Sequence, residues 1–176
     1  MIDITRFSLE TIAVWIVAFF IIEFPIREIY VNMGGNGFFQ RWYGFKEFNP
    51  ITVIVTDAFY FIIAILISYR IHEIFFKDII GFEKRFLYFF FILLIVQNII
   101  GIIFYYILVS LPQNYRNKWV KFFIDYGNNA KINALFSDSI YILAWTIAAY
   151  FVRFLPYDIL LLLFFFYIFV ITAISN

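Results

Sequence analysis

The sequence contains no cysteine and only one histidine, His72, among its 176 residues. The absence of cysteine excludes disulfides, thiolate metal sites and a cysteine nucleophile. A single histidine excludes bis-histidine haem ligation and the histidine clusters of membrane di-iron enzymes. We therefore expect this chain to bind no metal and no cofactor, and not to be an enzyme.

Charged residues are also scarce, since Asp, Glu, Lys and Arg make up 14% of the chain, compared with roughly 25% in a typical soluble domain. The net charge of +1 gives no field that would attract nucleic acid. Hydrophobic residues make up 65% of the chain and aromatic residues 25%. Because the few charges cluster between long apolar runs, the sequence predicts an all-α, polytopic transmembrane helical bundle that forms a single integral membrane domain over residues 1–176.

Five apolar runs are long enough to cross a bilayer, for which about 20 helical residues suffice. The predicted spans lie near residues 9–30, 51–70, 86–110, 133–152 and 157–175. Only a short connection at Arg153–Pro156 separates the last two spans. A chain with four spans, in which these two runs form one kinked or re-entrant element, therefore remains the alternative. The first run lacks a basic region before it and a cleavage site after it, so we expect it to be retained as a membrane helix.

Two segments combine aromatic and basic residues, which is the chemistry of the membrane–water interface. The first covers residues 38–46. In the second, over residues 115–126, apolar side chains recur with a helical period, which predicts a short amphipathic helix in the interface, followed by a turn at residues 126–129. The residues expected to contact lipid there are Arg41, Trp42, Lys46, Arg116, Lys118, Trp119 and Lys121.

Acidic residues open two of the apolar runs, each with a tyrosine three positions later. These pairs are Asp57 with Tyr60 and Asp138 with Tyr141. A carboxylate costs about 2.5–3.5 kcal/mol at the centre of a membrane helix and less toward the interface, so such residues should face protein. Both runs enter the membrane from the same side, and we therefore expect both aspartates at the same end of the bundle.

Other polar residues also lie within predicted spans. Glu23 and Arg27 are spaced i, i+4 and can pair on one helix face, although a helix end with a snorkelling arginine is the alternative. Amides in mid-membrane, such as those of Gln97 and Asn98, usually bond across a helix interface. The predicted intramembrane polar cluster comprises Glu23, Arg27, Asp57, Tyr60, Gln97, Asn98, Asp138 and Tyr141.

Short loops and the absence of a soluble domain favour a non-enzymatic membrane protein with a structural, assembly or scaffolding role. Its expected partners are the lipid bilayer, other membrane or coat proteins, and further copies of this chain, but not nucleic acid. The preference for Phe, Ile, Tyr, Asn and Lys is typical of AT-rich genomes and agrees with a viral or organelle membrane. The alternative function is a small transporter or channel subunit that uses the polar cluster.

Overall fold

The computed structural model describes residues 1–32, 37–44 and 47–175. Lys46 and most of the glycine-rich stretch before Phe38 lie outside the described residues. Within them the chain forms seven α-helices and a 3-10 helix, without any strand. The helices are α1 (Leu9–Asn32), α2 (Phe38–Trp42), α3 (Pro50–Phe75), α4 (Phe82–Ser110), η1 (Gln113–Tyr115), α5 (Lys118–Ala130), α6 (Ile132–Val152) and α7 (Tyr157–Ser175).

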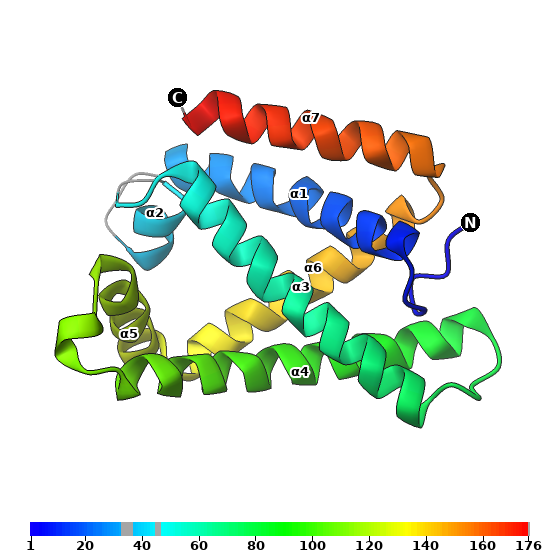
Figure 1. Ribbon diagram of the computed structural model, residues 1–176, viewed down its shortest axis with the longest axis horizontal. Coiled ribbons are helices and arrows are strands. Elements are labelled where there is room, and N and C mark those ends of the chain that lie inside the picture. The colour runs from blue at the N-terminus through cyan, green and yellow to red at the C-terminus, as the bar shows by residue number, and fades with distance from the viewer. Residues whose placement is uncertain (33–36, 45–46, 176) are drawn as a thin grey trace.

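Four of these helices are long and apolar enough to cross a membrane, namely α1, α3, α4 and α6. The shorter α7 is apolar as well. The predicted all-α polytopic architecture is confirmed, and the helices are consistent with an integral membrane protein. A turn over residues 153–156 separates α6 from α7, which then runs beside α1 (Figure 1).

The helix ends follow from local side-chain chemistry. Asn49 precedes Pro50, and its side chain accepts a hydrogen bond from the Thr52 amide at 2.8 Å, as expected for a helix start. At the C-terminal end of α4, the Arg116 guanidinium donates to the carbonyl oxygens of Val109 and Leu111 at 2.6 and 2.8 Å. These bonds satisfy carbonyl groups at and just beyond the end of α4, so Arg116 caps this helix.

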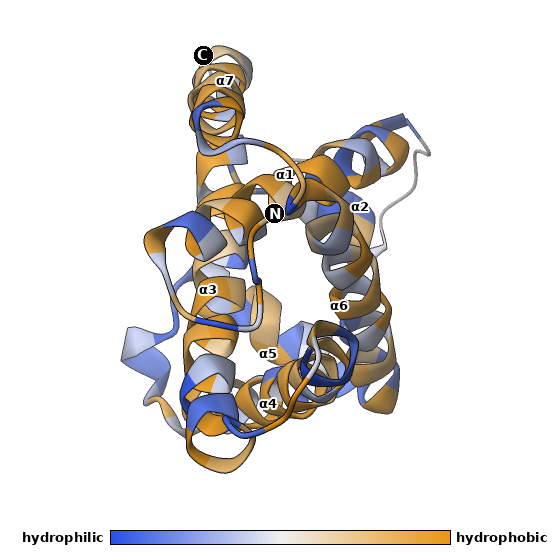
Figure 2. Cartoon of the chain, turned by 90° about the vertical axis from the view of Figure 1, so that its right-hand side faces the viewer, coloured by the Kyte–Doolittle hydropathy of each residue, from blue (hydrophilic) through white to orange (hydrophobic). Residues whose placement is uncertain are grey.

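The long helices form three levels in Figure 1, with α1 and α7 on one side, α4 on the other, and α3 and α6 crossing between them. Viewed from the end in Figure 2, α1, α3, α4 and α6 surround the centre of the bundle, and α5 lies behind them. Aromatic side chains fill the region where α1, α3 and α6 meet. The ring of Trp145 lies 4.2 Å from that of Phe61 and 5.3 Å from that of Phe19, measured between centroids.

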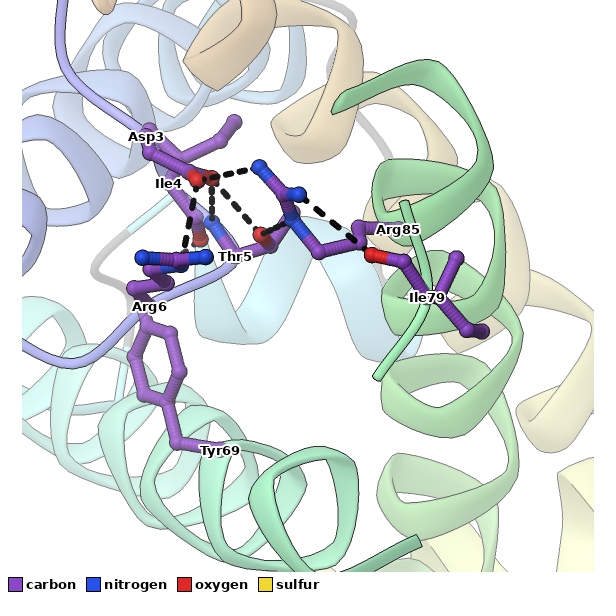
Figure 3. Close-up of polar contacts among 7 residues, drawn as sticks. All are labelled: Asp3, Ile4, Thr5, Arg6, Tyr69, Ile79 and Arg85. Atoms are coloured by element: carbon purple, nitrogen blue, oxygen red, sulfur yellow. Dashed lines mark hydrogen bonds and ion pairs between the residues drawn. The ribbon is translucent and has the colours of Figure 1, made fainter. Parts of the chain in front are cut away.

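Hydrogen bonds hold the N-terminal segment to the end of the bundle opposite α2 and α5 (Figures 1 and 3). The Asp3 carboxylate accepts from the Arg85 guanidinium at 2.7 Å and from the Thr5 hydroxyl at 2.6 Å. Burial alone would raise the pKa of Asp3, but the bonds from Thr5 and Arg85 outweigh it and lower that pKa. Nearby, the Tyr69 hydroxyl donates to the Ile4 carbonyl oxygen at 3.0 Å.

The predicted amphipathic helix forms, but at shifted boundaries. Tyr115 lies in η1 and is 68% exposed, so it does not belong to the apolar face of α5. The turn expected at residues 126–129 is wrong, because α5 continues to Ala130 and the chain turns at Lys131, whose φ is +48°. Gly127 lies inside the helix, where a Cβ atom would come within 2.3 Å of the Tyr105 ring. Glycine serves here for close packing of α4 on α5 and not for a turn.

Candidate functional site

A cavity of about 910 Å³ lies at the end of the bundle where α2 and α5 pack, between these helices and α3, α4 and α6. This volume falls within the usual range of about 300–1,000 Å³ for ligand sites. Most of the wall is aliphatic or aromatic. Five members of the predicted polar cluster line it, namely Asp57, Tyr60, Gln97, Asp138 and Tyr141.

On the α3 side, Asp57 and Tyr60 share one helix face because they are three residues apart. The indole Nε1–H of Trp42 donates to Asp57 Oδ2 at 2.9 Å, which connects α2 to α3. The Tyr60 hydroxyl donates to the backbone carbonyl oxygen of Gln97 at 3.3 Å. Both α3 side chains are half-buried and line the cavity wall.

On the α6 side, Asp138 is half-buried, and its carboxylate accepts no hydrogen bond from any residue that the structure describes. It lies close to α4 at Gly101. A Cβ atom at Gly101 would be 2.8 Å from the Tyr60 hydroxyl oxygen and 3.9 Å from Asp138 Oδ2. The glycine therefore allows the Tyr60 side chain to approach α4, whereas a Cβ atom would make only an ordinary contact with Asp138. Asp57 and Asp138 also interact electrostatically across the cavity.

The two neighbouring amides of α4 have different surroundings. Asn98 Nδ2 donates to the Ser139 hydroxyl at 3.2 Å and to the Leu94 carbonyl oxygen at 2.8 Å, so this residue joins α4 to α6. Gln97 is only 3% exposed. The amide oxygens of both residues, Asn98 Oδ1 and Gln97 Oε1, are buried and have no hydrogen-bond partner among the described residues. Gln97 lines the cavity, whereas Asn98 does not.

Glu23 and Arg27, which belong to the predicted polar cluster, do not line the cavity. Glu23 is 1% exposed, neither of its carboxylate oxygens has a hydrogen-bond partner in the described part of the chain, and it interacts electrostatically with Asp57. Arg27 forms an ion pair with Glu28 at 3.4 Å instead of the i, i+4 pair with Glu23 that the spacing allowed. Glu28 is the more exposed carboxylate, so pairing with it requires less desolvation.

Aromatic side chains of α2 and α5 cover the cavity at this end of the bundle. Trp42 stacks on Phe122 with ring centroids 5.3 Å apart and meets the Phe123 ring edge-on at 4.9 Å. The expected lipid contact of Trp42 is wrong, because its side chain is only 5% exposed. Burial of its ring and the hydrogen bond to Asp57 both favour this inward position. Trp119 packs on Phe123 at 4.7 Å and also lines the cavity.

Basic residues expected at the interface form ion pairs beside this cover. Arg41 pairs with Glu47, and its guanidinium lies over the Phe122 ring at 5.1 Å. The Lys118 ammonium donates to the Glu47 carbonyl oxygen at 2.9 Å, while Lys121 is exposed. The hydrogen bond from Arg41 is the main reason why the pKa of Glu47 is lowered. These contacts connect the segment after α2 to α5.

Sequence reasoning missed several residues of the cavity wall, including Tyr43, Lys131 and Trp145. A helical period does connect Trp145 to Asp138 and Tyr141 and could have found it, since these residues are spaced i, i+3 and i+7. No comparable signal marks Tyr43 or Lys131. Both were placed outside the predicted spans.

No known protein family, curated protein or solved structure matches this chain. Among the residues that the structure describes, no group of three His, Cys, Asp or Glu side chains could hold a metal ion. The cavity and its acidic groups are therefore the features from which a function can be inferred.

Proposed function

We propose that this chain is a small, non-enzymatic membrane transporter that holds its substrate in the cavity lined by helices α2, α3, α4, α5 and α6. The observation that carries this proposal is a cavity of about 910 Å³ with a carboxylate on each of two helices. The cavity is open to its surroundings, because wall residues such as Val55, Phe59 and Tyr106 are exposed, so a substrate can enter it. Acidic residues within membrane helices are costly, and they commonly mark substrate or ion pathways.

The cavity wall offers two kinds of contact to a substrate. Aromatic side chains from α2 and α5 would take up its apolar part, while Asp57 on α3 and Asp138 on α6 would orient its polar part. A substrate that touches both aspartates favours the arrangement in which α3 and α6 are close together. Binding can thereby shift the population between two arrangements of the helices, as alternating access requires.

The binding step can be tested with pyrene, a neutral apolar fluorophore, on the purified chain in lipid nanodiscs. Three tryptophans line the cavity, namely Trp42, Trp119 and Trp145. We expect saturable energy transfer from tryptophan to pyrene. The variant Ala134→Phe, which fills part of the cavity wall, should weaken this binding. The matched control Ala173→Phe adds the same ring to the exposed side of α7 and should leave binding unchanged.

Energy transfer that does not saturate, or that responds equally to both variants, would show that pyrene partitions into the lipid alone. That result would contradict the proposal. Circular dichroism of each variant establishes that the helices are intact, so a loss of binding can be separated from unfolding.

A structural or assembly role in a viral or intracellular membrane is the second candidate. Hydrogen bonds between helices favour it, since Trp42 binds Asp57 and Asn98 binds Ser139. Under this alternative, Asp57→Ala should lower stability or assembly with membrane or coat proteins while no substrate binding is measured. Saturable pyrene binding that Ala134→Phe abolishes in a folded protein would decide against it.

A further inference from the structure

The acidic groups in the cavity wall come from two helices, Asp57 from α3 and Asp138 from α6. The carboxylate of Asp138 accepts no hydrogen bond from a described residue. A buried acceptor without a donor is unfavourable, so these groups favour a ligand that supplies N–H or O–H donors.

The charge of the wall indicates the sign of the ligand. Its acidic residues are Asp57 and Asp138, and its basic residue among the described wall positions is Lys131. Lys131 is exposed and forms no ion pair with either aspartate. The aromatic rings around these groups present negatively charged faces, which also attract cations.

We propose that the cavity binds a protonated primary amine with an apolar or aromatic body, an inference that rests on the proposed transport function. An ammonium group has three N–H donors and no acceptor, which matches the carboxylates of Asp57 and Asp138. The body of the amine would lie against rings such as Trp119 and Trp145. Pairing of the ammonium with two carboxylates also reduces the cost of holding these charges inside a membrane protein.

Asp138 is the residue that best reports on this ligand. Asp57 already accepts a hydrogen bond from Trp42, so replacing it disturbs the contact between α2 and α3 as well. Asp138 has no such role in the described structure, and Asp138→Asn therefore removes charge from the cavity with little change in packing. Asp158→Asn is a matched control, because Asp158 is exposed at the start of α7 and away from the cavity wall.

Three probes with the same body separate charge from hydrogen bonding. They are phenylbutylamine, phenylbutanol and phenylbutyltrimethylammonium. Each is titrated into the nanodisc-reconstituted chain, and binding is followed by the fluorescence of the cavity tryptophans. We expect the amine to bind at least about tenfold more tightly than the alcohol, since a charged hydrogen-bonded pair normally gives a preference of this size or more. The trimethylammonium probe, which has charge but no N–H donor, should be intermediate.

The two variants test whether Asp138 recognises the charge of the ligand. Asp138→Asn should remove most of the preference for the amine over the alcohol, whereas Asp158→Asn should leave this preference unchanged.

Equal affinities of amine and alcohol in the unmodified chain would overturn this inference and leave the proposed cavity binding intact. The same conclusion follows if pyrene binds saturably and none of the three probes does. Failure of pyrene and of all three probes would overturn both proposals. Loss of pyrene binding in Asp138→Asn would mean that the substitution closes the cavity, and this outcome would also count against a charge-specific role.

Discussion

The hydrogen bond between Trp42 and Asp57 allows a quantitative test of how α2 is held on the bundle. Trp42→Phe removes the Nε1–H donor, which lies 2.9 Å from Asp57 Oδ2, but retains an aromatic ring. That ring can still stack on Phe122 and meet Phe123. The substitution therefore separates the hydrogen bond from most of the aromatic packing.

The expected loss has two parts. A hydrogen bond to a charged group contributes about 1.5–3 kcal/mol in water-soluble proteins, and interhelical bonds in membrane proteins contribute about 0.6–2 kcal/mol. Replacing indole with the smaller phenyl ring also removes buried apolar surface, at a cost of about 1 kcal/mol. We therefore expect Trp42→Phe to lower the free energy of unfolding by about 2–3 kcal/mol in total.

Trp119→Phe is the matched control. Trp119 packs on Phe123 and Phe104 in the same aromatic cover, and it donates no hydrogen bond to another described residue. Its replacement should cost only the packing part, about 1 kcal/mol or less. The assay is unfolding by sodium dodecyl sulfate in mixed micelles, followed by far-ultraviolet circular dichroism so that the loss of a tryptophan does not affect the signal.

A double-mutant cycle with Asp57→Ala isolates the bond itself. The coupling free energy between Trp42→Phe and Asp57→Ala should be about 1–2 kcal/mol. Additive effects of the two substitutions would refute the reasoning, because they would mean that the bond contributes nothing to stability. Equal losses for Trp42→Phe and Trp119→Phe would refute it as well, since ring size alone would then explain the result.

Four further substitutions give three separate predictions. Gly101→Ala places a Cβ atom 2.8 Å from the Tyr60 hydroxyl oxygen. Since the helix preference of Ala over Gly offsets about 1 kcal/mol of the steric cost, it should destabilise the fold by about 0–2 kcal/mol in the same unfolding assay. The pKa of Asp3 is lower in the folded than in the unfolded chain, so its carboxylate stabilises the fold above its unfolded pKa of about 3.9, and this stabilisation is lost as the pH falls through the folded pKa. Asp3→Asn should therefore weaken the loss of stability on acidification. This is measured by unfolding at a series of pH values below about 4. Asp57→Asn and Asp138→Asn should each abolish ion or proton flux in proteoliposomes if flux passes the cavity, and unchanged flux would contradict this prediction.

The sequence predicted the long helices well because their signals are local. A run of apolar residues reports directly on a membrane span, and the expected starts at Asn49 and Pro50 depend on capping within one turn. The end of α5 was misplaced since Gly127 resembles a turn residue when its neighbours in space are unknown. Its real constraint is the Tyr105 ring, which belongs to another helix.

The acidic residues of the candidate site could be predicted from the sequence, but the aromatic side chains of α2 and α5 that cover it could not. Aspartate near hydrocarbon is unusual in any membrane sequence, so Asp57 and Asp138 could be found from residue type and position alone. Trp42 belongs to a residue type that is common at the membrane surface, and only the tertiary structure shows that its indole points inward to Asp57.

The contrast between Asn98 and Gln97 shows why residue type alone could not separate polar groups that join helices from those that line the cavity. Both amides lie side by side in one apolar run, and sequence reasoning gave them the same role. One helical position (about 100° around the axis) directs Asn98 toward Ser139 on α6, where it bonds across the interface. Gln97 lies in the cavity wall instead and forms no hydrogen bond to α6, although the amide oxygens of both residues lack a partner among the described residues. Helix packing thus separates the two amides, and the measurement that distinguishes them is the free energy of unfolding, which Asn98→Leu should lower more than Gln97→Met.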